Sequence, residues 1–460
     1  MNDALVQRVQ NFALVEALAD FIASLRYEDL PEQVVAAAKI FIMDSLAVGV
    51  AGTTYDATDK AAAAAATWGQ GDTPAIGRLE LLLSRPAAAF VNGMQIHALE
   101  WDGLHEPSVV IALCAPLGAI AAELDRQGIT GKELILATVI AIEVAVFFGG
   151  DTTAGPRFFR PSCAGGMGAT AAMSRLRGFD RSQLIHALGL AHAQTAGTMQ
   201  AHWEGSMALP MQVGNAARMA HLAVDMVEAG MTGPVDFIDG RFGYFKLFES
   251  TGDVHALLAQ LGRPFKMTEM AHKPYPAGRA TQATLTMVRE LVQAHDFAPD
   301  DIEQINVFVP PLIVFLVGRP VQPDMTPSYA RLCLRFVVPL MLLDGEVEPR
   351  RYVPAAFEDP EIVALGTRIH IIEDDNPDEN ALGPQRMELI LKSGRRLQAS
   401  CADPLGSPGN PLSKQQREDK VRQCFALQLP DAQARAEQFI QASNDLHDLP
   451  DTRILLDLVS

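Results

Sequence analysis

Ionisable side chains crowd into one short segment of this chain, from His97 to Glu106. The segment holds two imidazoles and three carboxylates within ten positions and then leads into an apolar stretch. Such a cluster is costly to fold unless its groups are paired or lie in a solvated cleft. Carboxylates and histidines in a pocket can be tuned toward neutral pH, as proton transfer requires. The cluster therefore predicts an active site, and a helix cap followed by a solvated turn is the alternative.

The histidines of this cluster have a structural and a metal-binding interpretation. His97 lies one turn before the charged residues on an otherwise apolar helix, where a hydrogen-bonded structural histidine is the more common outcome. His97, Asp102 and His105 offer three metal ligands, but their spacing matches no zinc or iron motif. We therefore predict that His97 is structural and that no metal is bound.

A second dense site occupies residues 272–282, with the sequence HKPYPAGRATQ. Its prolines and glycine predict a rigid turn that presents Lys273, Tyr275 and Arg279 with little conformational entropy left to lose. Gln282 lies at the start of a predicted helix, where free backbone amides can bind an anion. A well-made connection whose charges face water is the alternative. Lysine and arginine beside rigid prolines favour a functional site in so acidic a chain.

Two further segments are weaker candidates. Residues 149–168 contain Arg160 between glycine pairs, and glycines that open a helix can bind a carboxylate or phosphate. The segment contains neither a G-x-G-x-x-G after a strand nor a Walker loop, so tight helix packing explains it equally well. Residues 202–206 place His202 at the polar start of a long helix, where capping by Ser206 is the alternative.

The elements that must position these residues are first helical and then mixed. Up to about residue 261, apolar residues recur at helical spacing, and several helices rich in Ala and Gly imply closely approaching backbones. The predicted helices cover residues 5–25, 31–50, 61–66, 84–99, 109–127, 131–148, 165–176, 181–196 (with Asp180 as its cap) and 206–229.

The pattern changes near Pro264 to a mixture of strands and helices. Strands are predicted at residues 265–272, 302–309 and 367–372, helices at 282–295 and 328–343, and a hairpin at 387–400 that turns at Ser393-Gly394. After a Pro- and Gly-rich link at 404–411, helices are predicted at 413–426, 431–442 and 451–459. We therefore expect a mainly α protein with an all-helical domain (residues 1–263 and 403–460) and a smaller α+β lid domain (residues 264–402).

Composition narrows the class of protein. The chain has 460 residues and a formal net charge of −18 without any Lys/Arg-rich run, which disfavours nucleic acid and anionic membranes as partners. Five scattered cysteines without a C-x-x-C pair favour reduced thiols in the cytoplasm. The acidic residues among the first 26 argue against a signal peptide. The most membrane-like run, residues 134–148, is short and holds Glu143, which predicts a buried helix.

Four blocks of the sequence, in order, resemble the MmgE/PrpD family, a group of dehydratases, decarboxylases and epimerases. The blocks are NGMQIHALEWDGLHEPS, LGLAHAQTAG…EGS, TGPVDFIDGRFGYFKLF and HKPYPAGRATQATL, and the resemblance covers nearly the whole chain. It implies a large helical domain completed by the C-terminal helices and a smaller α+β lid. It also implies an active site between them, usually in a homodimer, with no cofactor.

The resemblance can be followed residue by residue in two motifs. Glu100 stands where relatives have the first Asp of a D-F-D-D-T-H-like motif, and Asp102 and His105 match its later Asp and His. The K-P-Y-P motif and the residues after it are matched by Lys273, Tyr275 and Arg279.

This chain also departs from the family pattern, chiefly by replacing polar residues. The departures are Gly103-Leu104 in place of Asp-Thr, Ile111 in place of a histidine, Phe159 or Arg160 near another expected histidine, and Leu209 and Gln212 where Lys and His are common. Because apolar groups replace several polar ones, we expect a substrate that is less highly charged than a tricarboxylate.

The leading hypothesis is an enzyme that abstracts or delivers a proton next to a carboxylate or carbonyl of a small organic acid. Lys273 is the best acid/base candidate, because a partly desolvated lysine beside Arg279 should have a lowered pKa. Arg279 or Arg160 can hold a substrate carboxylate in a forked pair. The remaining candidates are His105 and Glu106 as the opposing acid or base, Tyr275 as a donor, Asp102 as a further catalytic residue, and Glu100, His202 and Gln282 as substrate-binding residues.

Several interpretations of the reaction stay open. Dehydration, decarboxylation and epimerisation of a small dicarboxylate share a stabilised carbanion, and a non-catalytic dimeric relative that binds small acids is a further alternative. A proton-transfer catalyst needs groups on opposite faces of its substrate. We therefore expect Lys273 and the His105–Glu106 pair to face one cavity between the two domains.

Overall fold

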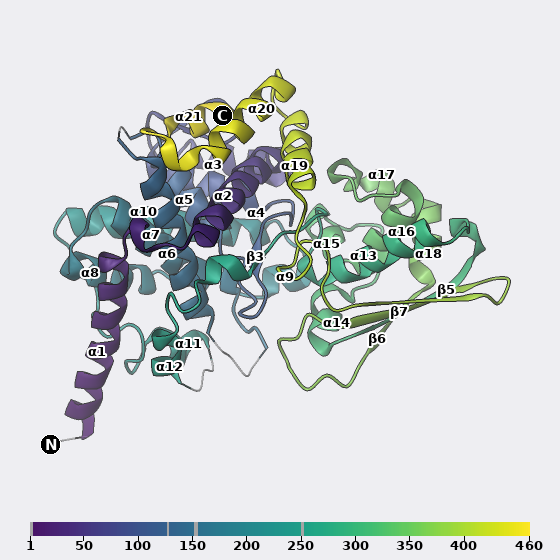
Figure 1. The fold of residues 1–460 in the computed structure, drawn as a ribbon, viewed down its shortest axis with the longest axis horizontal. Coiled ribbons are helices and arrows are strands. Elements are labelled where there is room, and N and C mark those ends of the chain that lie inside the picture. Colours follow the sequence, from purple (N-terminus) through teal and green to yellow (C-terminus); the bar gives the residue numbers. More distant parts are fainter. Residues whose placement is uncertain (1–2, 127, 151–154, 250–252) are drawn as a thin grey trace.

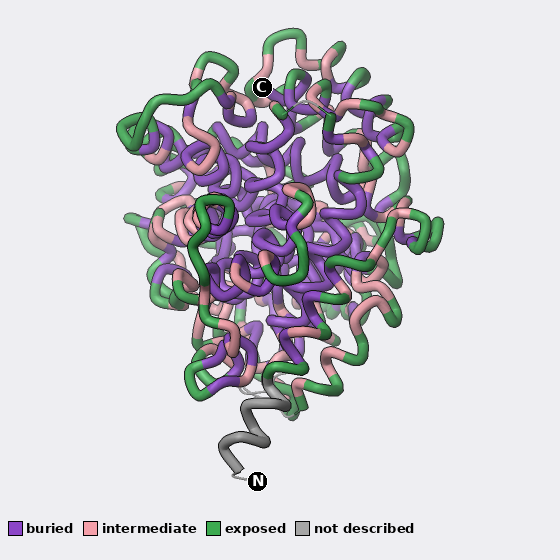
Figure 2. Tube along the Cα trace, turned by 90° about the vertical axis from the view of Figure 1, so that its left-hand side faces the viewer, coloured by how far each residue is buried: buried purple, intermediate pink, exposed green. Residues whose placement is uncertain are grey.

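The structure is a computed structural model that describes residues 3–126, 128–150, 155–249 and 253–460. Figure 1 shows a large group of helices on one side and a smaller part, built on a sheet, on the other. Buried backbone fills the interior and exposed backbone forms the rim (Figure 2). The mainly α class agrees with the sequence, whereas the residue boundaries drawn between the two domains stay predictions.

Helices dominate the first part of the chain. Small residues let them approach closely: a Cβ at Gly118 would lie 2.4 Å from the Cα of Gly93, so the predicted close packing is confirmed. The helices are α1 Asp3–Ser24, α2 Glu32–Gly52, α3 Asp56–Ala65, α4 Arg85–His97, α5 Cys114–Ala121, α6 Gly131–Gly149, α7 Arg160–Leu176, α8 Arg181–His192, α9 Gln200–Glu204, α10 Ala208–Glu228, α11 Tyr244–Phe248 and α12 Val254–Ala259.

This part is not purely helical, which corrects the sequence prediction. A short antiparallel hairpin joins β1 (Thr73–Ala75) and β2 (Arg78–Leu83) between α3 and α4. The predicted helix at 109–127 begins only at Cys114, because Val109 has φ 52° and His105 bridges to Val110 in a tight turn.

Two predicted helices begin earlier than expected, and both changes affect site residues. α7 begins at Arg160 because Pro161 is tolerated in a first helical turn. α13 (Arg279–Ala294) begins directly after Gly278.

The predicted strand at 265–272 is mostly a 3₁₀ turn (Lys266–Glu269) followed by the two-residue strand β4 (Met270–Ala271).

The later α+β part is built on one mixed four-stranded sheet in the order β6-β5-β7-β8. Strand β5 (Ile302–Val309) pairs parallel with β6 and antiparallel with β7. The predicted hairpin joins β7 to β8. The helix predicted at 328–343 is split at Leu332-Cys333. The elements are β5 Ile302–Val309, α14 Pro311–Val317, α15 Pro327–Arg331, α16 Leu334–Asp344, α17 Pro354–Phe357, α18 Pro360–Thr367, β6 Ile369–Glu373, β7 Gln385–Leu391 and β8 Arg396–Cys401.

The three C-terminal helices return to the first part of the chain, as the sequence predicted. α19 (Lys414–Ala426), α20 (Ala432–Asn444) and α21 (Arg453–Val459) all pack on α2. They form the yellow cap at the top of Figure 1. The helical core is thus made from both ends of the sequence.

Two apolar helices could be confused with membrane spans. By length and composition, α2 alone among the described helices is apolar enough to cross a membrane, with a mean hydropathy of 1.9. However, 72% of the tested stretch is buried against other parts of the chain, as in a core helix. The run at 134–148 lies within α6 and is buried throughout, as predicted.

Candidate active site

The two charged clusters of the sequence meet in one buried network. Lys273 Nζ donates to Glu100 Oε2 at 2.9 Å and to Asp102 Oδ1 at 3.2 Å. The side chains of Lys273 and Asp102 are fully buried and that of Glu100 nearly so. The ammonium therefore lies between two carboxylates with almost no access to solvent.

Backbone pairing brings these segments together. Strand β3 (Leu104–His105) pairs antiparallel with β4, and the indole nitrogen of Trp101 donates to the carbonyl of Pro274 at 3.1 Å. Glu100 has φ 52°, a left-handed conformation that is uncommon outside glycine. Strain of this kind persists where the surrounding structure fixes it, often at functional sites.

The network determines the charge of its members. Burial opposes the charged form of Lys273, but Glu100 and Asp102 outweigh it and raise the Lys273 pKa above its ordinary value. Burial likewise opposes ionisation of the two carboxyls, yet Lys273 and His97 lower the pKa of both. The predicted lowering of the Lys273 pKa is therefore wrong, because its nearest charges are carboxylates and Arg279 pairs elsewhere.

His97 completes the network from the end of α4. Its Nδ1 lies 3.0 Å from Asp102 Oδ2, and its Nε2 lies 3.3 Å from Glu100 Oε1 without hydrogen-bond geometry. Burial disfavours the imidazolium, but Asp102 and Glu100 raise the pKa of His97. The predicted hydrogen-bonded, buried histidine is present, while the purely structural role stays a prediction.

Lys420 of α19, which is not among the predicted site residues, binds the backbone of both clusters. Its Nζ donates to the carbonyls of Trp101 at 2.8 Å and Lys273 at 3.2 Å. It also forms a buried ion pair with Asp44 of α2 at 2.7 Å. A single lysine in an amphipathic helix gave no signal of this role.

A cavity lies beside the network, between the helical part and the α+β part, with about 640 Å³ of empty space when the part open to solvent is included. Glu100 reaches its wall, whereas Lys273 stands behind Glu100 and does not line it. The other ionisable residues of the wall are Arg160, His202 and Arg279. The cavity thus receives one member of the buried network and two candidate carboxylate-binding residues.

Both arginines of the wall are held by glutamates of the protein. Arg279 Nε and Nη2 donate to the two carboxylate oxygens of Glu106 at 2.7 and 2.9 Å. Arg160 Nε and Nη2 donate to those of Glu249 at 2.9 and 3.1 Å. Glu106 is predicted from the sequence as a possible base, whereas Glu249, which directly follows the block TGPVDFIDGRFGYFKLF, is not predicted.

His202 lines the cavity as a neutral imidazole. Burial and the nearby guanidinium of Arg319 lower its pKa to about 3. Arg319 Nη2 lies 3.4 Å from His202 Nδ1 and can only donate, so the neutral ring carries its proton on Nε2. His202 can therefore offer one N–H donor at neutral pH.

Comparison with known proteins agrees with this two-part architecture. The MmgE/PrpD N-terminal domain matches residues 16–257, and the MmgE/PrpD C-terminal domain matches residues 275–446. The chain belongs to the MmgE/PrpD family.

Several curated relatives in this family are named as decarboxylases. Cis-aconitate decarboxylase of Homo sapiens is 26% identical over 463 residues, which cover 97% of this chain and 94% of the relative. The Mus musculus enzyme of the same name is 26% identical over 466 residues, covering 97% and 93%. A cis-aconitate decarboxylase-like protein of Aspergillus oryzae is 23% identical, covering 85% and 86%.

His105 does not face the same cavity as the other site residues of this MmgE/PrpD chain. Its Nε2 lies 3.0 Å from Glu269 Oε2 and its Nδ1 2.8 Å from Ser108 Oγ, and it lines a separate cavity with both of them. The prediction that Lys273, His105 and Glu106 face one cavity is therefore wrong. Glu100, which pairs with Lys273, and Arg279, which pairs with Glu106, do line the interdomain cavity.

Tyr275 and Gln282 serve the turn that carries Lys273. The Gln282 side chain donates to the carbonyls of Tyr275 at 3.1 Å and Ala277 at 2.8 Å, and accepts from the Tyr275 backbone. Burial raises the pKa of the Tyr275 hydroxyl, which lies outside the cavity wall. The geometry gives Gln282 a structural position and does not bring either residue to the cavity.

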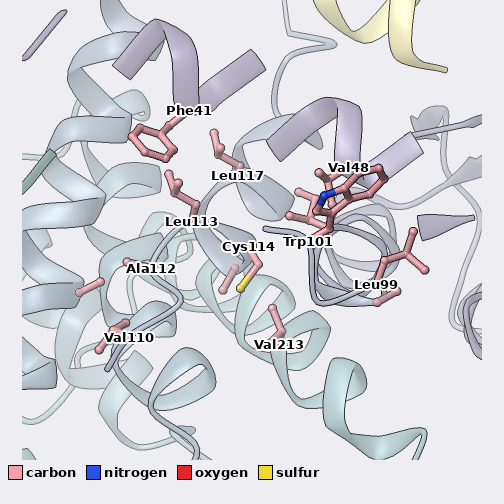
Figure 3. Packing of buried hydrophobic residues seen from close by; sticks show 14 of the residues in the cluster. Phe41, Val48, Leu99, Trp101, Val110, Ala112, Leu113, Cys114, Leu117 and Val213 are labelled. Atoms are coloured by element: carbon pink, nitrogen blue, oxygen red, sulfur yellow. The ribbon is translucent and has the colours of Figure 1, made fainter. Parts of the chain in front are cut away.

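His97, Asp102 and Cys114 form the one metal-like group among the described residues, with ligand atoms within 4.8 Å of one another. Two observations argue against a metal fit. Lys273 already places a cation on Asp102, and burial raises the pKa of the Cys114 thiol well above its ordinary value. Cys114 lies among apolar side chains (Figure 3). We assign no metal to this group.

Proposed function

We propose that this protein is a lyase that acts on a small organic acid and delivers a proton to carbon next to a carboxylate or carbonyl. One observation carries the proposal: a buried lysine–carboxylate network reaches the interdomain cavity through Glu100. The names of the curated relatives, which are decarboxylases at low identity, support a lyase of this kind.

The charge states of the network favour proton delivery. Because two carboxylates raise the Lys273 pKa, Lys273 is an ammonium at neutral pH. Glu100 stands between Lys273 and the cavity. A carbanion is a much stronger base than either group, so it can take a proton from Glu100 while Nζ gives one to Glu100 in the same concerted step. The Nε2–H of His202 supplies a second donor, suited to an oxygen on which negative charge develops.

Decarboxylation fits these charge states better than dehydration or epimerisation. Loss of CO₂ leaves a carbanion that must be protonated, which requires an acid. Dehydration and epimerisation begin with proton abstraction, which requires a base. Glu100 and Asp102 have lowered pKa values and are therefore weak bases.

The proposal can be tested with a panel of small unsaturated and keto acids in D₂O. We expect CO₂ release together with deuterium at the carbon that lost it, both detected by NMR. Glu100→Gln should reduce turnover by about 10²–10⁴-fold, and Glu303→Gln, an exposed matched control on β5, should not. Deuterium exchange without CO₂ would indicate an epimerase, and tight binding without either would indicate a non-catalytic relative.

We also propose a cytoplasmic homodimer that works without a cofactor or metal. The family resemblance supports the dimer and the cofactor-free chemistry. The five free, buried cysteines support a reducing compartment. Light scattering of the purified protein and turnover after dialysis against a chelator test the dimer and the metal independence.

A further inference from the structure

We propose that the interdomain cavity takes an apolar organic acid with a single carboxylate, and that Glu106 excludes acids of higher charge. This inference rests on the function proposed above and narrows its substrate class.

The wall of the cavity is mostly apolar. Among the described residues that form it, only Glu100, Arg160, His202 and Arg279 carry ionisable side chains, and all the others are apolar or glycine. The wall includes Ile111, an apolar residue that follows the charged segment 97–106. Apolar wall residues from both parts of the chain include Leu104, Val109, Phe158, Met199, Leu316 and Leu332.

In the conformation observed, the carboxylate-binding fork of Arg279 is already occupied. Nε and Nη2 form a bidentate pair with Glu106, and Nη1 donates to the carbonyl of His272 at 3.1 Å. A planar guanidinium recognises carboxylates through this fork. Glu106 therefore occupies the position that a substrate carboxylate would need.

Arg160 is engaged in the same way, with one difference. Glu249 takes its fork, and Nη1 donates to the carbonyl of Ser108 at 3.3 Å and to Asn380 Oδ1 at 3.3 Å. Burial raises the pKa of Glu249 even though Arg160 opposes this shift. Because burial disfavours the Glu249 carboxylate, a single substrate carboxylate that displaces it can take the fork of Arg160.

Among the described residues of the wall, no further positive charge remains for a second carboxylate. Lys273 is shared between Glu100 and Asp102, and His202 is neutral at physiological pH. Glu100 itself adds a negative charge to the wall. A second or third substrate carboxylate would be buried without a partner, which is strongly unfavourable.

Matched acids test the charge limit directly. Hex-2-enoate and hex-2-enedioate have the same chain length and differ by one carboxylate, and cis-aconitate supplies the tricarboxylate. Calorimetry should give the wild-type protein at least about tenfold tighter binding of hex-2-enoate than of the other two acids, because an unpaired buried carboxylate opposes the latter.

Glu106→Gln tests the assigned gate. It removes the charge that occupies Arg279, so the affinity for hex-2-enedioate relative to hex-2-enoate should rise by at least about tenfold. Glu303→Gln on the exposed side of β5 is the matched control and should leave the ratio unchanged. Glu106→Ala, which also releases Arg279, provides a second variant if thermal unfolding shows that Glu106→Gln is misfolded.

The outcomes separate this inference from the proposed function. Preferred binding of hex-2-enoate without CO₂ release or deuterium incorporation from any acid supports the charge limit and refutes the lyase. Turnover of cis-aconitate with equal or tighter binding than hex-2-enoate supports the lyase and overturns the charge limit. An unchanged affinity ratio in a folded Glu106 variant also overturns it.

Discussion

Four buried groups at the site come close to balancing one another's charge. Lys273 faces two carboxylates, Glu100 and Asp102, which leaves one negative charge in excess. His97 lies against both carboxylates, and they raise its pKa against the opposing effect of burial. With His97 protonated the set is neutral. A proton can then move within the set without creating a net buried charge.

Lys273→Met should destabilise the protein by about 3–5 kcal/mol, because it leaves two buried carboxylates without their cation. Urea unfolding measures the effect. Lys392→Met, in the exposed turn of the β7–β8 hairpin, is the matched control and should change the unfolding free energy by less than about 0.5 kcal/mol. A Lys273→Met protein as stable as the wild type would contradict the buried ion network.

Acid should weaken the fold through the same carboxyls. Burial opposes their ionisation, but Lys273 and His97 lower the pKa of Asp102 and Glu100 below the ordinary values of 3.8 and 4.5. A carboxyl whose pKa is lowered by folding stabilises the protein above its unfolded pKa, and this contribution disappears as the pH falls through the folded pKa. The free energy of unfolding should therefore decrease below a pH of 4.5.

Asp102→Asn tests this acid dependence. The free energy of unfolding of this variant should fall less steeply with decreasing pH, because one of the two carboxyls with a lowered pKa is absent. Urea unfolding between neutral and acid pH gives the slopes. His97 acts in the opposite direction: its raised pKa adds stability below its ordinary value of 6.5, and this is lost as the pH rises through the folded value. Equal acid slopes in the wild type and Asp102→Asn would refute the assignment.

At this scale the sequence predicts which residues gather but not which of them pair. The density of ionisable groups identifies both clusters, because charges are placed together only where a fold compensates them. The pKa direction of Lys273 depends on Glu100, which is 173 positions away in the chain, and that contact is invisible in local spacing. Arg279, its sequence neighbour, turns to Glu106 instead.

Helix starts decide where the two arginines of the cavity lie. Arg160 is the first residue of α7 and Arg279 the first residue of α13. A cation is unfavourable at a helix N-terminus, where the backbone amides carry partial positive charge. Glu249 and Glu106 offset this cost. The sequence places both starts several residues too late, because Pro161 and Gly278 obscure the helical period.

The contact between α19 and the site is the next feature to test. Lys420→Met should lower the unfolding free energy by about 3–5 kcal/mol, because it leaves Asp44 buried without its cation. It should also reduce turnover, because the carbonyls of Trp101 and Lys273 lose a shared donor. Lys414→Met on the same helix is the exposed control.

The measurement for Lys420 is urea unfolding combined with separate values of kcat and KM. A merely structural lysine would change the unfolding curve and leave kcat of the folded fraction unaltered. Lys420→Arg retains the charge and should recover part of both losses. Full activity in folded Lys420→Met would contradict the positioning role.

For the whole molecule, the sequence predicts the architecture better than the internal surfaces. Helical periodicity, the change of pattern near Pro264 and the family resemblance predict the mainly α part, the mixed sheet and the return of the C-terminal helices. The division into two separate cavities follows from side-chain packing around the His105–Val110 turn. The spacing of residues in the sequence carries no signal of two cavities, and the predicted cavity of His105 is therefore wrong.

Because the core is closed by both ends of the sequence, a chain that lacks residues 413–460 should fail to fold. The deletion removes buried side chains that pack with α2, among them Phe425, Phe439 and Leu455. Each such side chain contributes about 1.5–3 kcal/mol when buried, and a domain has a net stability of only about 5–15 kcal/mol.

The deletion also leaves Asp44 buried without its ion-pair partner, because Lys420 lies on α19. The shortened chain should therefore accumulate in the insoluble fraction, and co-expression of residues 413–460 as a separate fragment should restore a soluble complex with ordered Trp101 fluorescence. Recovery in trans would show that the C-terminal helices act through packing and not through chain continuity. The shortened chain could instead be soluble and unfold at the same urea concentration as the wild type. In that case α2 would be stable without the C-terminal helices, and the inference that they complete the core would be wrong.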